Sequence, residues 1–247
     1  RMLKKPAAER LKLLRNAEGK EGQFLWAILR DSFHYAAVHL STIADCARDL
    51  DQAMRWGYGM QQGPFELWQD AGWLDVAKMV QEDIDAGKAL CKAPLPQWVF
   101  EGPVAEAGGV HTANGSWSAS QAQFVPRRVL PVYERQIFPE KLLGETNLPD
   151  WQTAGTTIAE TKALRTWTLD ENESPSGKRV LIASIKNKMH AISPEVMEGL
   201  MEAVEVAESD FDGMVIWSGD SPFSVGADLE ATMPAFVIGG ADAIESI

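Results

Sequence analysis

Apolar residues recur at three- and four-residue spacing through the first third of the chain, which predicts a set of helices. In LWAILRDSFHYAAVHL, residues 25–40, this spacing places five apolar side chains on one helix face: Leu25, Leu29, Phe33, Ala36 and Leu40. The same reading predicts a short second helix in STIADCA, capped by Ser41. A third helix is expected to begin at Asp49 and to stop at Gly57 in WGYG.

Two further helices are predicted from their end signals. GPFELWQDAG places Pro64 in a first helical turn and Gly72 at an exit, and WLDVAKMVQEDIDAG ends at Gly87. The pattern then changes over residues 93–155, where Pro, Gly and Ser dominate and stop regular helices. Aromatic residues are nevertheless spread through this stretch, and a disordered linker would be poor in them. We expect an ordered irregular arm that packs its aromatics on a neighbouring domain, with a partly mobile spacer as the alternative; those aromatics are Trp98, Phe100, Trp117, Phe124 and Tyr133.

The last part of the chain alternates strand-like and helix-like patterns. ALRTWTL and RVLIASI, separated by the turn-rich NESPSGK, predict a hairpin. SPEVMEGLMEAVEVAES predicts a helix with Ser193 as N-cap and Pro194 in its first position. GMVIWS is a continuous apolar run, which favours a buried parallel strand. The predicted face of the helix comprises Met197, Leu200, Met201, Val204 and Ala207.

Composition narrows the class of protein. The 247 residues carry a net charge of −12, which argues against general binding to nucleic acid or anionic membranes. No apolar run approaches the roughly 18 residues that a membrane span needs, so we expect none. Two cysteines, Cys46 and Cys91, do not suggest a disulfide framework and fit a reducing cytoplasm. No Cys/His cluster or HExxH suggests a metal site.

The stretch SPFSVGADL, residues 221–229, directly follows the predicted parallel strand. Ligands bind at the carboxyl ends of parallel strands, and small residues let a substrate approach the backbone. The backbone amide of Ala227 could then donate to a substrate carbonyl oxygen, as one half of an oxyanion hole. The alternative, which these nine residues alone leave open, is a glycine turn that merely starts a helix.

The order RVLIASIKNKMHAIS, a Pro-started helix, GMVIWSG and then SPFSVGADL resembles the start of the crotonase family, the enoyl-CoA hydratase/isomerase fold, over about residues 162–247. The resemblance implies that Ala227 supplies one of two oxyanion amides that polarise a thioester. It also implies that residues around KNKMHAIS and SVGAD approach coenzyme A. The implied CoA-binding residues are Lys188, His190, Ala191, Ser224, Val225, Gly226 and Asp228.

In that family a second oxyanion amide and the acid/base glutamates follow later in the chain, and no matching segment occurs here. The resemblance therefore implies about the first third of a crotonase domain. Glu230 and Glu245 are more simply read as solvated helix acids than as catalytic groups.

Residues 29–77 resemble the all-helical C-terminal domain of 3-hydroxyacyl-CoA dehydrogenases, most specifically in GPFEL and in the WGYG stop. No GxGxxG dinucleotide fingerprint occurs in the chain, so the implied NAD site is expected outside it. None of the four histidines takes the family's catalytic role; His34 and His39 are read as packing or surface residues, and the others are His111 and His190.

Together the two resemblances imply an α+β multidomain arrangement: a helical domain over residues 1–92, an arm over 93–155, and the start of a crotonase-like α/β unit over 156–247. This order resembles bacterial bifunctional enzymes of fatty-acid β-oxidation, which hydrate trans-2-enoyl-CoA and oxidise 3-hydroxyacyl-CoA with NAD. The implied ligand is an acyl-CoA, and the helical zone, which could be the second of two copies, is expected to make interdomain or homo-oligomer contacts. A non-catalytic docking or dimerisation module is the alternative.

Overall fold

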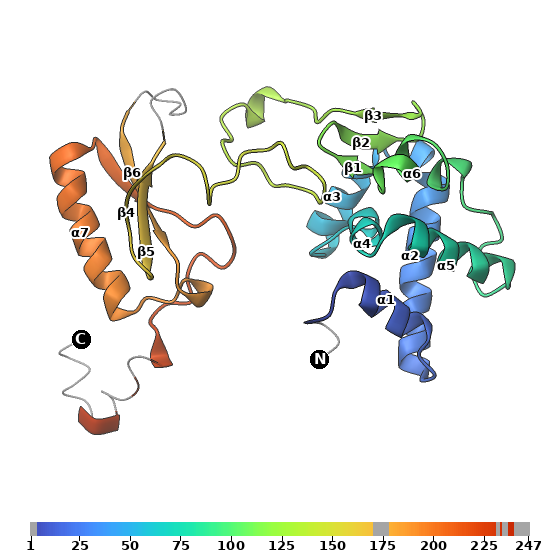
Figure 1. The fold of residues 1–247 in the computed structure, drawn as a ribbon, viewed down its shortest axis with the longest axis horizontal. Helices are drawn as coiled ribbons and strands as arrows, with labels where there is room; N and C mark the ends of the chain where they lie inside the picture. Colours follow the sequence, from blue (N-terminus) through green and yellow to red (C-terminus); the bar gives the residue numbers. More distant parts are fainter. Residues whose placement is uncertain (1–3, 170–177, 231–232, 234–236, 240–247) are drawn as a thin grey trace. The chain divides into compact units, whose positions relative to one another are not determined.

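The chain divides into two compact units in a computed structural model that describes residues 4–169, 178–230, 233 and 237–239. Unit 1 comprises Arg1–Leu130 and Glu140–Leu148, and unit 2 comprises Pro131–Pro139 and Pro149–Ile247 (Figure 1). Both helices and sheets are present, as an α+β chain requires. Within the described ranges, no helix has the length and apolar character needed to cross a membrane.

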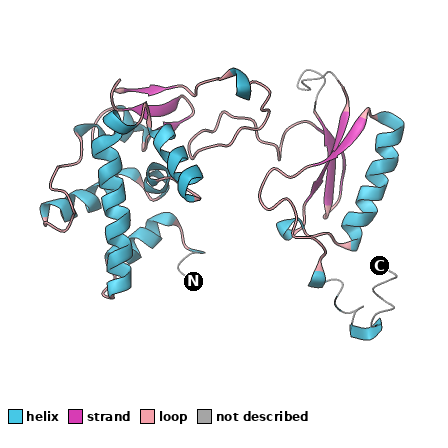
Figure 2. Cartoon of the chain, turned by 180° about the vertical axis from the view of Figure 1, so that it is seen from behind, coloured by secondary structure: helices cyan, strands magenta, loops and turns pink. Residues whose placement is uncertain are grey.

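The helical part of unit 1 is drawn in cyan in Figure 2 and surrounds a core that includes Phe33, Phe65 and Trp68. Its elements are α1 (Ala7–Arg15), α2 (Lys20–Ile43), α3 (Ala47–Tyr58), α4 (Pro64–Asp70) and α5 (Trp73–Asp85). The helix expected over residues 25–40 is confirmed as part of α2. Its predicted face is wrong at Leu25, which is 46% exposed, because the buried stripe runs instead through Trp26, Phe33, Ala37 and Leu40.

Three predicted helix ends are wrong. Ser41 caps nothing, because α2 continues through it to Ile43. Helix α3 has Cys46 rather than Asp49 at its N-cap, and it ends at Gly59 instead of Gly57. Gly59 has φ of 66°, a left-handed conformation that glycine adopts without steric cost, whereas Gly57 stays helical.

The helix predicted from GPFEL is confirmed as α4, and α5 is confirmed as well. Gly63 is the N-cap of α4, and its own N–H donates to the Glu66 carboxylate at 3.1 Å. A Cβ at position 63 would lie 2.4 Å from the Asp51 side chain. Glycine is therefore required there by close packing.

A small antiparallel sheet of order β1-β2-β3 extends unit 1 beyond its helices. The elements of this region are η2 (Gln97–Val99), α6 (Pro103–Ala107), β1 (His111–Thr112), β2 (Gly115–Ser118) and β3 (Gln123–Val125). Trp117 is buried in the unit 1 core, with Trp98, Phe100 and Phe124 packed against it. The expectation that these aromatics pack in an ordered region is confirmed, whereas Tyr133 in η3 (Pro131–Tyr133) is 49% exposed.

Unit 2 is a four-stranded sheet of order β4-β5-β6-β7 with one long helix packed on it (Figure 1). Its elements are β4 (Thr156–Glu160), β5 (Leu164–Thr168), β6 (Val180–Ile185), η4 (Lys188–His190), α7 (Pro194–Asp210) and β7 (Gly213–Ile216). The hairpin is confirmed, since β5 and β6 are antiparallel, and β7 runs parallel to β6 as predicted. Strand β4, which pairs with β5, was not predicted.

Burial in unit 2 differs from the prediction. Helix α7 begins as expected, with Ser193 Oγ accepting from Val196 N, but it turns Val196, Ala203 and Ala207 inward. Met197 and Met201 of the predicted face are 52% and 62% exposed. Strand β7 is not buried either, because it lies at the edge of the sheet and leaves Val215 and Ile216 exposed.

Candidate functional site

The candidate site lies where two parallel strands end. The chain leaves β6 at Ile185 and β7 at Ile216, and the Trp217 N–H extends the ladder by donating to Ala183 O at 2.9 Å. Parallel strands bring their carboxyl ends to the same edge of a sheet. The turn after β6 (residues 186–192) and the turn after β7 (residues 217–228) therefore meet there, and we call them the turn pair.

Ala227 joins the turn pair through a parallel bridge with Ile192. Ile192 N–H donates to Gly226 O at 2.8 Å, and Asp228 N–H donates to Ile192 O at 2.9 Å. In a parallel ladder the residue opposite such a pair directs its own N–H and C=O away from that neighbour. The Ala227 N–H therefore points away from Ile192, and within the described part of the chain no hydrogen bond uses it.

Several residues around Ala227 stabilise the turn by hydrogen bonds within it. Gly226 has φ of 86°, which favours glycine, and its N–H donates to Ser224 Oγ at 3.0 Å. Ser224 Oγ in turn donates to His190 O at 2.7 Å. Val225 is 50% exposed, and Asp228 Oδ1 accepts from Glu230 N at 3.1 Å. Ser224 is thus engaged inside the turn pair, while Val225 is open to a ligand.

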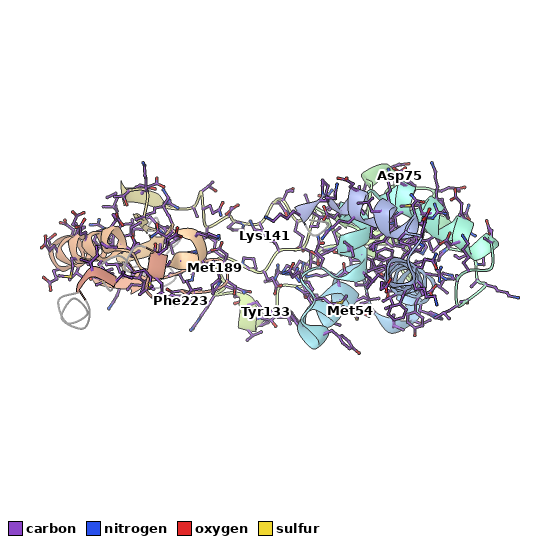
Figure 3. All side chains as sticks on the ribbon, turned by 90° about the horizontal axis from the view of Figure 1, so that it is seen from below. Met54, Asp75, Tyr133, Lys141, Met189 and Phe223 are labelled. Atoms are coloured by element: carbon purple, nitrogen blue, oxygen red, sulfur yellow. The ribbon has the colours of Figure 1, made fainter. Side chains whose placement is uncertain are left out.

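Some of the residues that follow β6 are exposed to solvent and others are buried. Lys188 is exposed, and among the described residues its ammonium has no hydrogen bond or ion pair. Ala191 is half-buried, and its carbonyl accepts from Asn187 Nδ2 at 3.1 Å. His190 is buried, with its ring inside the turn pair. Figure 3 labels Met189 and Phe223, exposed apolar side chains that come one from each turn.

Ser218, His190 and Asp220 lie together, but they do not form a nucleophilic triad. His190 Nδ1 is 2.6 Å from Pro222 O, and a carbonyl only accepts, so Nδ1 carries a proton. Ser218 Oγ, 3.1 Å from the same nitrogen, cannot pass its proton there and donates to Asp220 O at 2.9 Å. His190 Nε2 faces Asp220 Oδ1 at 3.3 Å and lies 3.5 Å from Ser218 Oγ, too far for a base paired with a nucleophile. The set therefore ties the turn together and does not activate Ser218.

An aromatic cluster that the sequence did not predict supports the turn after β7. Trp217 packs edge-on against Trp151 with ring centroids 5.5 Å apart, and Phe138 and Trp167 complete the cluster. Trp167 Nε1 donates to Ser184 Oγ at 3.1 Å. The four rings come from separate segments of unit 2, so no local spacing indicates them. The only available signal is the high tryptophan count, nine in the chain.

Unit 1 contains a second group of a serine, a histidine and an aspartate, which is buried in the core. His111 Nε2 donates to Asp51 Oδ2 at 2.8 Å, and His111 Nδ1 lies 2.9 Å from Ser116 Oγ. The two Asp51 oxygens also accept from the N–H groups of Phe65 and Glu66 at the start of α4. Neither the Asp51 nor the His111 side chain is accessible to solvent. No substrate can reach this set, so its role is structural.

The other candidate groups of unit 1 are also structural. His34 is buried, with Nε2 2.6 Å from Ala93 O, and the His39 ring packs at a tilt of 41° against Tyr35, with ring centroids 4.4 Å apart. Both match the expected packing or surface role. Burial raises the pKa of the Cys46 thiol, which keeps it in the unreactive protonated form. The part of the chain that the structure describes contains no His/Cys/Asp/Glu group suited to a metal ion.

An apolar groove of about 690 Å³ lies along α2 in unit 1. Phe24, Ile28, Tyr35 and Ile43 of α2 face it together with Met54 of α3, which Figure 3 labels. Phe24 and Tyr35 are 65% and 59% exposed. This groove belongs to unit 1, whereas the turn pair belongs to unit 2.

Two curated proteins are similar to the chain. A probable 3-hydroxyacyl-CoA dehydrogenase of Bacillus subtilis strain 168 is 24% identical over 220 residues, which cover 89% of this chain and 25% of the relative. A putative fatty acid oxidation complex trifunctional enzyme of Rickettsia felis is 24% identical over 212 residues, covering 85% of this chain and 23% of the relative. No protein-family model and no solved structure matches the chain.

The chain therefore spans about a quarter of the length of the curated relatives that it matches. An alignment of 220 residues is longer than either unit, so the similarity extends into both. At this low identity, the relatives support a relation to 3-hydroxyacyl-CoA dehydrogenases and fatty-acid oxidation enzymes.

Proposed function

We propose that residues 1–247 form part of a fatty-acid β-oxidation enzyme that hydrates trans-2-enoyl-CoA and oxidises 3-hydroxyacyl-CoA with NAD. The relatives that extend into both units support the oxidation chemistry and the fatty-acid setting. The hydratase part, with unit 2 as the start of a crotonase-like domain, is supported by the parallel β6–β7 pair and the turns that follow it. Unit 1 is proposed as the dehydrogenase-like helical domain.

The observation that carries this proposal is the Ala227 amide. It belongs to an exposed residue at the carboxyl end of a parallel strand pair, and the Ile192 bridge holds it without using its N–H. A fixed donor aimed at a thioester oxygen stabilises the charge that develops there during addition of water. Removing one such donor typically costs about 3–4 kcal/mol of transition-state stabilisation.

The other groups that the reactions need are not recognisable among these 247 residues. We propose that a second oxyanion amide, the acid/base glutamates and the NAD site belong to other segments of the enzyme. The polypeptide 1–247 is therefore proposed to be inactive alone. NADH formation from 3-hydroxybutanoyl-CoA by the purified chain, above a heat-inactivated control, would contradict this.

Binding of a short acyl-CoA tests the proposed site. Calorimetry with butanoyl-CoA should detect binding to the wild-type chain and to Ala227→Ser, which keeps the backbone N–H. Ala227→Pro removes that donor and should weaken binding several-fold, because a hydrogen bond is worth about 0.5–1.5 kcal/mol net. Equal affinity in the Ser and Pro variants, or no binding by the wild type, would remove the support for an oxyanion role.

The α2 groove favours a second candidate, a docking or dimerisation module. An exposed apolar surface of this kind commonly marks an interface. A second copy of this chain is the proposed occupant, because an apolar groove is compatible with an equivalent apolar surface. Light scattering coupled to size-exclusion chromatography should then report a dimer that Ile28→Lys disrupts. A monomer at high micromolar concentration would contradict it.

A further inference from the structure

The ring of His190 connects the two turns that meet at the candidate site. Its Nδ1–H donates to Pro222 O, four residues ahead of Gly226, while its backbone oxygen accepts from Ser224 Oγ. Gly226 N–H then donates to that same hydroxyl at 3.0 Å. A continuous series of hydrogen bonds thus runs from the His190 carbonyl through the Ser224 hydroxyl to Gly226, the residue before Ala227.

The backbone at His190 adopts a conformation that needs support from its surroundings. Met189 and His190 have φ of 55° and 52°, in the left-handed region that residues with a Cβ rarely enter. Two such residues in succession persist only where neighbouring contacts hold them. The contacts with Pro222, Ser224 and Ser218 supply that support.

The second ring nitrogen faces the same turn. His190 Nε2 lies 3.3 Å from Asp220 Oδ1, and within the described part of the chain no other charged side chain pairs with the ring. The ring is buried, with its side chain 10% exposed, so little of it is left for a ligand. The Asp220 side chain is 61% exposed, which makes this contact the weaker of the two.

We propose that His190 is a positioning residue for the Ala227 amide and not a group that contacts coenzyme A. The Nδ1–H···O=C bond to Pro222 fixes residues 222–226, and these fix Gly226 O against Ile192 N. Ala227 is then held with its N–H directed away from the bridge. The positioning of the turn stands on these contacts alone, whereas its use in catalysis rests on the proposed function.

A matched pair of variants tests this role. In His190→Asn the side-chain NH₂ falls near the position of Nδ1 and can still donate to Pro222 O, whereas in His190→Gln it falls near Nε2 and cannot. Amide hydrogen exchange, followed by NMR in the purified chain, should be about tenfold faster at Ile192 and Asp228 in His190→Gln than in the wild type. In His190→Asn it should stay within about threefold of the wild type.

The exchange of Arg165 and Ser184, in the β5–β6 pair, is the internal control and should not change. Equal exchange at Ile192 and Asp228 in the Asn and Gln variants would overturn the proposal. So would wild-type exchange rates in His190→Gln. If both variants also lose protection from hydrogen exchange in the β5–β6 pair, unit 2 is no longer folded in them and a measurement on the wild type replaces the comparison. A long-range ¹H–¹⁵N spectrum of the wild-type His190 ring should show Nδ1 protonated. An unprotonated Nδ1 would overturn the proposal.

Acyl-CoA binding distinguishes a failure of the positioning role of His190 from a failure of the proposed function of the Ala227 amide. If His190→Gln loosens the bridge and butanoyl-CoA leaves the wild-type Ala227 amide unchanged, the positioning role stands and the proposed function fails. If butanoyl-CoA binds at Ala227 and His190→Gln leaves the bridge intact, the function stands and the positioning role fails.

Discussion

Each unit of this chain assembles a serine, a histidine and an aspartate, and the two sets differ in what surrounds them. Asp51, His111 and Ser116 lie in the core of unit 1, where the side chains of the acid and the imidazole have no solvent exposure. Ser218, His190 and Asp220 lie in the turn pair of unit 2, with Asp220 61% exposed. The residue types alone therefore do not identify a site.

Burial and hydrogen-bond direction separate the two sets. In unit 1, Asp51 accepts from two backbone N–H groups of α4 and from His111, so every contact serves the fold. In unit 2, the contacts of His190 end beside Ala227, whose N–H points away from the Ile192 bridge. A buried polar network contributes stability to a core, whereas one at a strand end can also position a ligand donor.

The largest contrast is expected between the two aspartates. Asp51→Ala leaves two helix N–H groups and a buried imidazole without an acceptor, so unit 1 should lose about 3–5 kcal/mol of unfolding free energy. Asp220→Ala should change unit 2 by about 0.5 kcal/mol or less, because its carboxylate is mostly in water. Urea unfolding, read by peptide-resolved hydrogen exchange in each unit, measures both. Similar losses would contradict the contrast.

Acid should affect unit 1 through another buried carboxylate. Burial alone would raise the pKa of Asp83. Hydrogen bonds from Trp26 and Arg15 have a larger, opposite effect, so the pKa of Asp83 lies below its ordinary value of 3.8. A carboxylate whose pKa is lower in the folded state than in the unfolded state stabilises the folded protein. This stabilisation is complete above the pKa of the unfolded state and is lost as the pH falls through the pKa of the folded state.

Unit 1 should therefore lose stability as the pH falls below about 4 and the Asp83 carboxylate becomes protonated. Asp83→Asn should be less stable than the wild type at neutral pH, and its stability should fall less steeply in acid. Urea midpoints measured from pH 7 to pH 2.5 provide the test. Parallel pH profiles for the wild type and Asp83→Asn would show that Asp83 does not contribute.

The smallest contrast concerns the two serines. Ser116 is 2% exposed, and its removal leaves the buried His111 Nδ1 unpaired, so Ser116→Ala should cost about 1–2 kcal/mol. Ser218 is only half-buried, so Ser218→Ala should stay within about 0.5 kcal/mol in unit 2. The same unfolding assay resolves them, and a larger effect of Ser218→Ala would show that the turn pair depends on that hydroxyl.

Local signals predicted most helices and the pairing of three strands. Pro64, Ser193 and the apolar spacing in α2 act within a few residues, so they can be read directly. The sequence did not reveal which face of α7 is buried. Val196, Ala203 and Ala207 recur at helical spacing, and so do the methionines of the opposite choice. Small residues on the packed face let the helix approach the sheet closely, and that preference depends on the partner.

Contacts between distant segments were not predictable. The segment Glu140–Leu148 returns to unit 1 through a buried ion pair of Arg48 with Glu145 and through Leu143 N–H, which donates to Glu66 at 3.0 Å. His111 is 60 positions from Asp51, so no local pattern joins them. At the candidate site, the strand–turn order predicted that residues 221–229 follow a parallel strand, whereas the oxyanion role of Ala227 stays a prediction. The interior position of the His190 ring depended on the second turn.

The most direct test of the central claim follows the Ala227 amide by ¹H–¹⁵N NMR while the chain is titrated with butanoyl-CoA. Its control is S-butyl-CoA, a thioether that keeps the chain length but lacks the carbonyl oxygen. A donor to the thioester oxygen predicts a downfield shift of the Ala227 proton with butanoyl-CoA and little change with the thioether. Equal shifts with both ligands, or none with butanoyl-CoA at saturation, would contradict it.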